Sequence, residues 1–241
     1  MNQRPAVAAT CTAWQTPPVL YERTLPGLHD FLAARVLPVF ASRPGRCIDL
    51  GAGTGAFASR LQSWGWDVTA VERDTAGFEA ELPVEAADLD EGGLAERFGL
   101  FDLAVAVEVI EHLERPTGFQ RDLGGLLAPA GVAVVTTPNV DNVIARTKFL
   151  LTDRLRMMDR DGDPTHISPI FVDLLPRYLA RADLHLAAHL TFPEGFIASR
   201  GWVSGAGKLL SRILPGAANV GDNHVFVLVK PTHPHLSQRR Q

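Results

Sequence analysis

The chain has 241 residues, of which 46% are hydrophobic, and this is enough to bury the core of one α/β domain. Its formal net charge of −4 disfavours a polyanionic partner, so we expect no binding to nucleic acid. Two cysteines make no disulfide framework, and the absence of an 18-residue apolar run predicts no membrane span, so we expect a cytoplasmic protein.

The N-terminal part of the sequence changes character near residue 28. Residues 1–27 form a polar, proline-bearing arm, which we expect to be partly disordered. From Leu28 to Val39 apolar residues recur at helical spacing, which predicts a helix. It either covers one face of a following sheet or lies beside a ligand-binding turn.

A glycine-rich segment follows at Arg46–Gly55, which reads R-C-I-D-L-G-A-G-T-G. It predicts a strand, a tight turn and a helix, whose free N–H groups would point into the turn. Glycines at Gly51, Gly53 and Gly55 allow positive φ angles and a close approach of the backbone to a ligand. Asp49, inside the strand end, is a carboxylate that needs a partner in order to be buried.

The next patterns continue the alternation of strands and helices. Asp67–Glu72 predicts a second strand whose last residue is an acid 17 residues after Gly55. An acid at that place can accept both hydroxyls of an adenosine ribose. A helix is predicted near Thr75–Glu81, and a short third strand at Val84–Leu89.

A central strand is predicted at Phe101–Val109, because its nearly continuous apolar run is typical of burial on both faces. A helix and a fifth strand, Val132–Thr137, follow it. This alternation predicts a parallel, doubly wound sheet that binds ligands at the carboxyl ends of its strands. The acids that the sequence places at such ends are Asp49, Glu72, Asp88 and Glu108.

The second half of the sequence carries two expected insertions. One, at about 140–168, contains a short amphipathic helix around 150–158 and would overhang the ligand pocket as a lid; a plain surface elaboration is the alternative. A helix at 171–182 and a strand at 184–191 come next, before a second cover at 196–214. A last strand at 225–229 completes a domain that we place at 28–232, followed by a polar tail at 233–241.

Two groups of motifs resemble a known family. D-L-G-A-G-T-G followed by V-E-R-D resembles the first two motifs of class I S-adenosylmethionine-dependent methyltransferases. E-V-I-E-H-L-E-R-P, together with T-T-P-N, resembles the branch that includes ubiquinone-biosynthesis O-methyltransferases. The resemblance implies a Rossmann-like, mostly parallel seven-stranded sheet with helices on both faces. It also implies S-adenosyl-L-methionine as cofactor, a small-molecule acceptor methylated on a hydroxyl, and is compatible with a homodimer.

The resemblance also assigns roles to individual residues. Asp88, with Leu89 beside it, would receive the adenine amino group, although Asp88 could also be a solvated loop acid. The implied cofactor-binding residues are Asp49, Gly51, Gly53, Gly55, Glu72, Asp88, Leu89 and Glu108.

Candidate catalytic residues are two histidines, His112 and His166. In one interpretation Glu108 lines the cofactor pocket and His112 acts as a general base on an acceptor hydroxyl. In a second, Glu108, Glu111 and His112 hold a divalent cation. In a third, Glu111 and His112 only cap a helix and contact solvent. His166, in D-P-T-H-I-S-P, either faces the active site or is exposed on a loop.

Two rival functions share the predicted fold. An NAD(P)-dependent oxidoreductase is disfavoured, because its usual fingerprint G-x-G-x-x-G differs from the G-x-G-x-G found here. A non-catalytic binding protein with a cofactor fold is disfavoured by the acids retained at every implied cofactor position.

Overall fold

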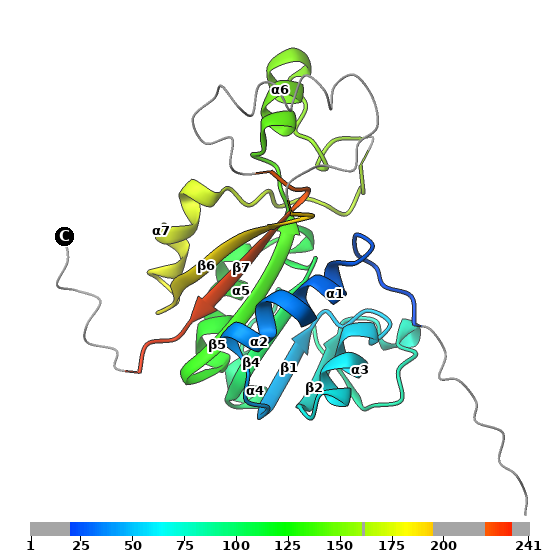
Figure 1. The fold of residues 1–241 in the computed structure, drawn as a ribbon, viewed down its shortest axis with the longest axis vertical. Helices are drawn as coiled ribbons and strands as arrows, with labels where there is room; N and C mark the ends of the chain where they lie inside the picture. Colours follow the sequence, from blue (N-terminus) through cyan, green and yellow to red (C-terminus); the bar gives the residue numbers. More distant parts are fainter. Residues whose placement is uncertain (1–19, 161, 195–219, 233–241) are drawn as a thin grey trace, which may run out of the picture.

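The fold is built on a seven-stranded sheet with the strand order β3-β2-β1-β4-β5-β7-β6 (Figure 1). This computed structural model describes residues 20–160, 162–194 and 220–232. The strands are β1 (Arg46–Leu50), β2 (Asp67–Glu72), β3 (Val84–Ala86), β4 (Phe101–Val107), β5 (Leu127–Pro138), β6 (His185–Phe192) and β7 (Asn223–Val229). Most of the expected N-terminal arm, the expected cover at 196–214 and the tail at 233–241 lie outside the described residues.

The strand directions match the mostly parallel sheet predicted from the sequence. Strands β3, β2, β1, β4 and β5 pair in parallel. Strand β7 is reversed, since it pairs antiparallel with both β5 and β6. Parallel sheets are buried on both faces, which agrees with the apolar runs of the central strands.

Helices cover both faces of the sheet, as predicted for a doubly wound fold (Figure 1). One face carries α1 (Leu28–Phe31), the π-helical turn η1 (Leu32–Val36), α2 (Leu37–Phe40) and α3 (Ala56–Ser63). The other carries α4 (Leu94–Phe98), α5 (Pro116–Leu126) and α7 (Leu175–Leu179), the last preceded by η4 (Val172–Leu174). Within the described ranges, no helix combines the length and the apolar character that crossing a membrane requires.

Neighbouring residues of the central strands enter two different cores, because side chains alternate along a strand. Cys47 and Leu103 pack in the core beneath α1–α3, which also contains Phe57. Ile48 and Ala104 pack in the core on the α4, α5 and α7 side. The two cores hold β1 and β4 rigidly from both faces, and the loops at their carboxyl ends therefore start from fixed positions.

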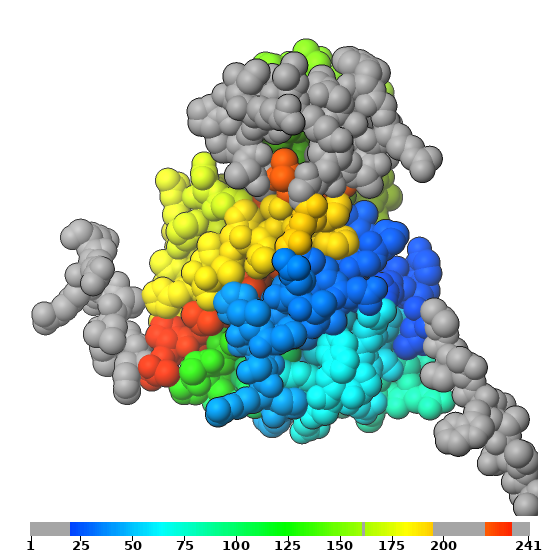
Figure 2. Space-filling view, in the orientation of Figure 1, coloured from blue at the N-terminus to red at the C-terminus, as the bar shows by residue number. Residues whose placement is uncertain are grey.

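The N-terminal helical segment, Leu28–Phe40, reaches across to the last strands. Figure 2 shows this segment in blue against the yellow surface of β6. The rings of Phe31 and Phe192 have centroids 5.3 Å apart, and Arg35 forms an exposed ion pair with Glu194 at 3.3 Å. The segment therefore links the first half of the chain to the end of the sheet.

The prediction of a helix at Thr75–Glu81 is wrong, because only the three-residue turn η2 (Thr75–Gly77) forms there. The backbone N–H groups of Glu79 and Ala80 both donate to the carbonyl oxygen of Thr54, at 3.0 and 3.1 Å. Those donors are thus committed to the glycine-rich turn, and the helix cannot continue through them.

Strands β3 and β4 end earlier than predicted, at Ala86 and Val107. After β3 the Asp88 side chain accepts a hydrogen bond from the backbone of Asp90 at 2.9 Å, which turns the chain. After β4 the backbone of Glu108 adopts φ 55, a conformation that ends an extended strand. Both acids therefore lie just beyond their strands.

The helix expected around residues 150–158 lies earlier in the chain, as α6 (Val143–Thr152). Asn142 caps its start by accepting a hydrogen bond from Ala145 N at 2.9 Å, and Asp153, with φ 54, ends it. Figure 1 shows α6 projecting from the body of the molecule. Leu150 is 82% exposed, so within the described structure this residue is not part of a packed amphipathic face.

Candidate functional site

A cavity of about 710 Å³ opens at the carboxyl ends of β1, β2 and β4, where a doubly wound sheet binds its ligands. Its volume lies within the range of small-molecule sites. The predicted cofactor residues that line it are Asp49, Gly51, Gly53, Glu72, Asp88, Leu89 and Glu108. Both candidate histidines, His112 and His166, also line it. The strand topology therefore brings together residues that are far apart in the sequence.

Gly53 forms the floor of the cavity at the glycine-rich turn. Its φ is 58, and among the described residues a Cβ added to it would have only the Arg23 Cδ atom within 4 Å, at 3.9 Å. The space beside this backbone is therefore open to the cavity. A side chain there would occupy room that a ligand can use, which explains why a residue without a side chain is needed.

Gly55 has a different part in the turn and is not among the residues that line the cavity. It precedes α3 with φ 84, and a Cβ on it would lie 2.5 Å from the Cβ of Ala80 and 2.7 Å from the Phe78 ring. This glycine allows the segment after β2 to pack on the turn. Its assignment as a cofactor residue stays a prediction, and any effect on a ligand would be indirect.

Asp49 is buried at the end of β1, with its side chain in the lining of the cavity. Burial, together with the negative charge of Glu72, raises its pKa to about 7. Its Oδ2 atom has no hydrogen-bond partner among the described residues. A buried carboxylate oxygen of this kind needs a donor, and a ligand in the cavity can provide one.

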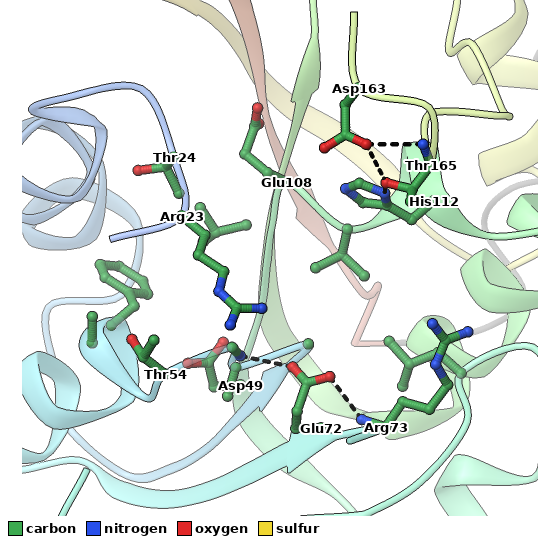
Figure 3. Close-up of a pocket in the computed structure, with 18 of the residues that line it drawn as sticks. Arg23, Thr24, Asp49, Thr54, Glu72, Arg73, Glu108, His112, Asp163 and Thr165 are labelled. Atoms are coloured by element: carbon green, nitrogen blue, oxygen red, sulfur yellow. Dashed lines mark hydrogen bonds between the residues drawn. The ribbon is translucent and has the colours of Figure 1, made fainter. Parts of the chain in front are cut away.

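Glu72 ends β2 and is fixed against the glycine-rich turn (Figure 3). Its Oε2 atom accepts from Gly53 N at 2.7 Å, and Oε1 accepts from Arg73 N at 2.8 Å. A carboxylate has about four acceptor positions, so both oxygens can still accept from two ligand hydroxyls. The position and the unused acceptors fit an adenosine ribose.

Asp88, rather than the neighbouring Asp90, faces the cavity. The carboxylate of Asp90 accepts hydrogen bonds from the backbone of Glu114 at 3.0 Å and of Arg115 at 2.7 Å. It therefore holds the chain after η3 (Ile110–His112) and is not in the cavity lining. Asp88 and Leu89 remain beside each other at the cavity wall, a polar acceptor next to an apolar surface, which suits a heteroaromatic ring with an amino group.

Residues Tyr21–Leu25 form a strap along one wall of the cavity, which the sequence analysis missed. The Thr54 hydroxyl donates to the Tyr21 carbonyl oxygen at 2.8 Å, and Glu22 forms an ion pair with Arg60 at 2.6 Å. Figure 3 shows the Arg23 guanidinium directed into the cavity, toward Asp49 and Glu72. Single polar residues in a proline-bearing arm carry no periodicity, and no sequence signal marked them.

Glu108 lies at the end of β4 in the left-handed region, with φ 55. Non-glycine residues in this region are uncommon and concentrate at functional sites. The Glu108 N–H donates to Thr136 Oγ1 at 2.9 Å, and the Thr136 hydroxyl donates to Glu108 Oε1 at 2.7 Å. Burial raises the pKa of Glu108 to about 7. The Thr136 contact turns its carboxylate toward β5.

His112 and His166 meet on the far side of the cavity, although they are 54 positions apart in the sequence. Their ring centroids are 4.7 Å apart, and His166 Nδ1 lies 2.9 Å from the carbonyl oxygen of Met157. The loop that carries His166 is held by two backbone hydrogen bonds, because Ile167 N and Ser168 N both donate to Glu111 O at 2.9 Å. Part of the expected lid insertion therefore does line the cavity.

The alternative in which Glu108, Glu111 and His112 hold a cation differs from the set that the structure brings together. In the part of the chain that the structure describes, Glu111, His112 and His166 each offer a ligand atom within 4.8 Å of the others. One carboxylate and two imidazoles suit a transition metal better than a hard cation. Glu111 is fully buried, and burial next to Glu108 raises its pKa well above the ordinary value. The interpretation of Glu111 as a solvent-exposed cap is therefore wrong.

Comparison with known proteins gives a consistent result. A family model described as a methyltransferase domain matches residues 21–189, which is most of the chain. The ubiquinone biosynthesis O-methyltransferase of Caulobacter sp. (strain K31) is 35% identical over 103 residues. That match covers 39% of this chain and 41% of the relative, so the chain spans about two fifths of the curated relatives it matches.

Solved structures resemble the whole fold. A SAM dependent methyltransferase from Archaeoglobus fulgidus superposes with a TM-score of 0.60 at 18% identity, over 84% of this chain and 92% of that one. The 1,6-didemethyltoxoflavin-N1-methyltransferase of Burkholderia thailandensis superposes with a TM-score of 0.53 at 16% identity, over 86% of this chain and 80% of that one. At these identities the likeness shows a shared fold.

Proposed function

Because the chain belongs to the class I S-adenosylmethionine-dependent methyltransferases, we propose that it transfers a methyl group to a hydroxyl of a small-molecule acceptor. The cofactor is S-adenosyl-L-methionine, which supplies an electrophilic methyl group when bound. The observation that carries the proposal is the shape of the cavity. It has a glycine floor with acids at the strand ends on one side and two imidazoles on the other.

The acids at the strand ends are assigned to the nucleoside half of the cofactor. Glu72, fixed by Gly53 N, binds the ribose hydroxyls, and Asp88 with Leu89 binds the adenine. This assignment is supported by the unused acceptor positions of Glu72, by the cavity-facing position of Asp88 and by the family resemblance.

The methionine half is assigned to residues around the glycine floor. The orphaned Oδ2 atom of buried Asp49 is an acceptor for the amino group, or for a water that it binds. The Arg23 guanidinium, directed into the same space, suits the carboxylate (Figure 3). Gly53 leaves room for this half because its backbone has no side chain there.

The acceptor is assigned to the side of the cavity that holds His112 and His166. An imidazole can remove the hydroxyl proton as the oxygen attacks, and a positioned base typically contributes about 10²–10⁴ in rate. Burial and the neighbouring His166 lower the pKa of His112, so its neutral, proton-accepting form predominates at neutral pH. The walls around it align the acceptor and exclude water.

Labelled methyl transfer tests the proposal. The protein is incubated with methyl-labelled S-adenosylmethionine and panels of small phenols, alcohols and amines, and the labelled products are identified by mass spectrometry. Label on an oxygen supports O-methylation. Label only on nitrogen or carbon would overturn the choice of nucleophile but not the family. Binding of cofactor without any transfer would favour the non-catalytic alternative.

A further inference from the structure

We propose that Thr165 and Asp163 are positioning residues that hold His112 in one tautomer, with Nδ1 protonated and Nε2 free to accept a proton. The catalytic consequence rests on the proposed hydroxyl methylation. The tautomer itself does not, since it follows from hydrogen bonds among the protein's own residues.

The three side chains form a continuous chain of hydrogen bonds (Figure 3). The Thr165 Oγ1 atom lies 2.8 Å from His112 Nδ1 and 2.6 Å from Asp163 Oδ1. The backbone N–H of Thr165 also donates to Asp163 Oδ1, at 2.8 Å. The hydroxyl is therefore fixed between an imidazole nitrogen and a carboxylate oxygen.

The number of protons decides the direction of each bond. A threonine hydroxyl has one proton to donate, and an ionised carboxylate can only accept. The two hydrogen bonds from Thr165 lower the pKa of Asp163, so this carboxylate is ionised at neutral pH. The hydroxyl proton therefore points to Asp163, and the remaining contact requires His112 Nδ1 to donate to Thr165 Oγ1.

The opposite arrangement is unfavourable for a simple reason. If Thr165 donated to His112 Nδ1, the Thr165 oxygen would face the Asp163 carboxylate oxygen at 2.6 Å without a proton between them. Two oxygen atoms with facing lone pairs repel each other at that distance. A neutral His112 is consequently protonated on Nδ1, and its lone pair is on Nε2.

The free nitrogen is on the useful side of the ring. Figure 3 shows the ring edge of His112 that is remote from Thr165 turned toward the open part of the cavity. His166 is held in the same tautomer, because its Nδ1 contacts the carbonyl oxygen of Met157, which can only accept. The two histidines thus keep their Nδ1 atoms bound to the loop at 153–168 and leave both Nε2 atoms available.

This arrangement defines the proton step of the proposed reaction. The acceptor hydroxyl gives its proton to His112 Nε2 while its oxygen forms a bond to the methyl carbon. The bond between that carbon and sulfur breaks, and its electron pair stays on sulfur. The positive charge that develops on the imidazole lies one hydroxyl away from the Asp163 carboxylate, which stabilises it.

Nitrogen-15 NMR of the full chain with bound adenosylhomocysteine tests the tautomer without any methyl transfer. The His112 signals are assigned by comparison with His112→Gln, and neutral Nδ1–H and Nε2–H imidazoles are distinguished by the shifts of their two nitrogens. We expect Nδ1–H in the wild type and in Thr165→Ser, and loss of this preference in Thr165→Val. An Nε2–H ring in the wild type, or an unchanged ring in Thr165→Val, would overturn the proposal.

Kinetics on an identified acceptor test the consequence. Thr165→Val is expected to lower kcat about tenfold or more, with KM for the cofactor unchanged, and Thr165→Ser to restore it. Asp163→Ala should also lower kcat, because it removes the acceptor of the Thr165 hydroxyl proton. Thr152→Val, which removes an exposed hydroxyl bonded to Lys148 O at 2.7 Å, is the matched control and should have no effect. Equal kcat in Thr165→Val and wild type would overturn the positioning role, whereas inactivity of every protein, wild type included, would count against the proposed function alone.

Discussion

The carboxylate of Glu72 is bonded to the backbone of Gly53: its Oε2 atom accepts from that N–H group at 2.7 Å. The last residue of β2 and the turn after β1 are therefore one unit, even though 19 positions separate them. A hydrogen bond to a charged acceptor of this kind both fixes the side chain and keeps the turn open. Changes at either residue should affect the same ligand in different ways.

Glu72→Gln should weaken binding of adenosylhomocysteine about 10- to 100-fold, because hydrogen bonds to a charged group contribute about 1.5–3 kcal/mol. Isothermal titration calorimetry measures this. Glu85→Gln, on neighbouring β3, removes an exposed ion pair with Arg97 and serves as the control with unchanged affinity. An unchanged dissociation constant in Glu72→Gln would refute the ribose assignment.

Alanine at the two glycines should separate binding from stability. Gly53→Ala places a methyl group in the cavity and should abolish measurable cofactor binding, with a loss of stability of about 1–2 kcal/mol from its positive φ. Gly55→Ala has the same backbone cost and adds a clash with Phe78 and Ala80, so it should be destabilised by about 1–3 kcal/mol more. Thermal unfolding and calorimetry on both variants check this. Equal melting temperatures would contradict the packing role of Gly55.

Arg23→Met should weaken the binding of adenosylhomocysteine by about tenfold or more, since it removes a charge-assisted contact to the ligand carboxylate. Methylthioadenosine, which has no carboxylate, should bind equally to the variant and the wild type. The comparison of the two ligands by calorimetry isolates the carboxylate contact. Arg35→Met, at an exposed ion pair with Glu194, is the control. A parallel loss for both ligands would mean that Arg23 shapes the strap instead.

The stability of the ligand-free protein should depend on pH through Asp49. Its pKa is raised to about 7 in the folded protein from 3.8, so the folded state binds a proton that the unfolded state has released. The contribution is fully present below about pH 4 and is lost as pH rises through about 7. Relative to Asp49→Asn, the wild type should therefore lose free energy of unfolding between pH 5 and pH 8 in urea titrations. A difference that stays constant with pH would disprove the shifted pKa.

The strands were predictable because their signals are local. Strand β2 runs from Asp67 to Glu72 as predicted, and the topology rule for parallel sheets then places its terminal acid at the ligand edge. The prediction of a helix at Thr75–Glu81 failed because the spacing of apolar residues does not show which acceptors the backbone N–H groups bond to. Here the N–H groups of Glu79 and Ala80 bond to Thr54 across the turn.

The remaining parts of the site depend on contacts between distant segments. His112 and His166 were each recognised as candidates, but their meeting at 4.7 Å depends on the loop at 153–168 folding back onto Glu111 O. Thr165 gave no sequence signal, because a threonine in a polar loop has many ordinary roles. Arg23 was missed for the same reason, since its function depends on the strap lining the cavity.

The strap has a practical consequence for anyone who shortens this protein. Tyr21–Leu25 precede α1, yet they form a wall of the cavity and are held by Thr54 and Arg60. A version trimmed to begin at Leu28 would keep every strand and both cores and would still unfold cooperatively. Its cofactor pocket, however, would lack one wall. If the trimmed protein folds but does not bind the cofactor, the missing wall explains the loss of binding. Such a result would not count against the assignment to the methyltransferase family.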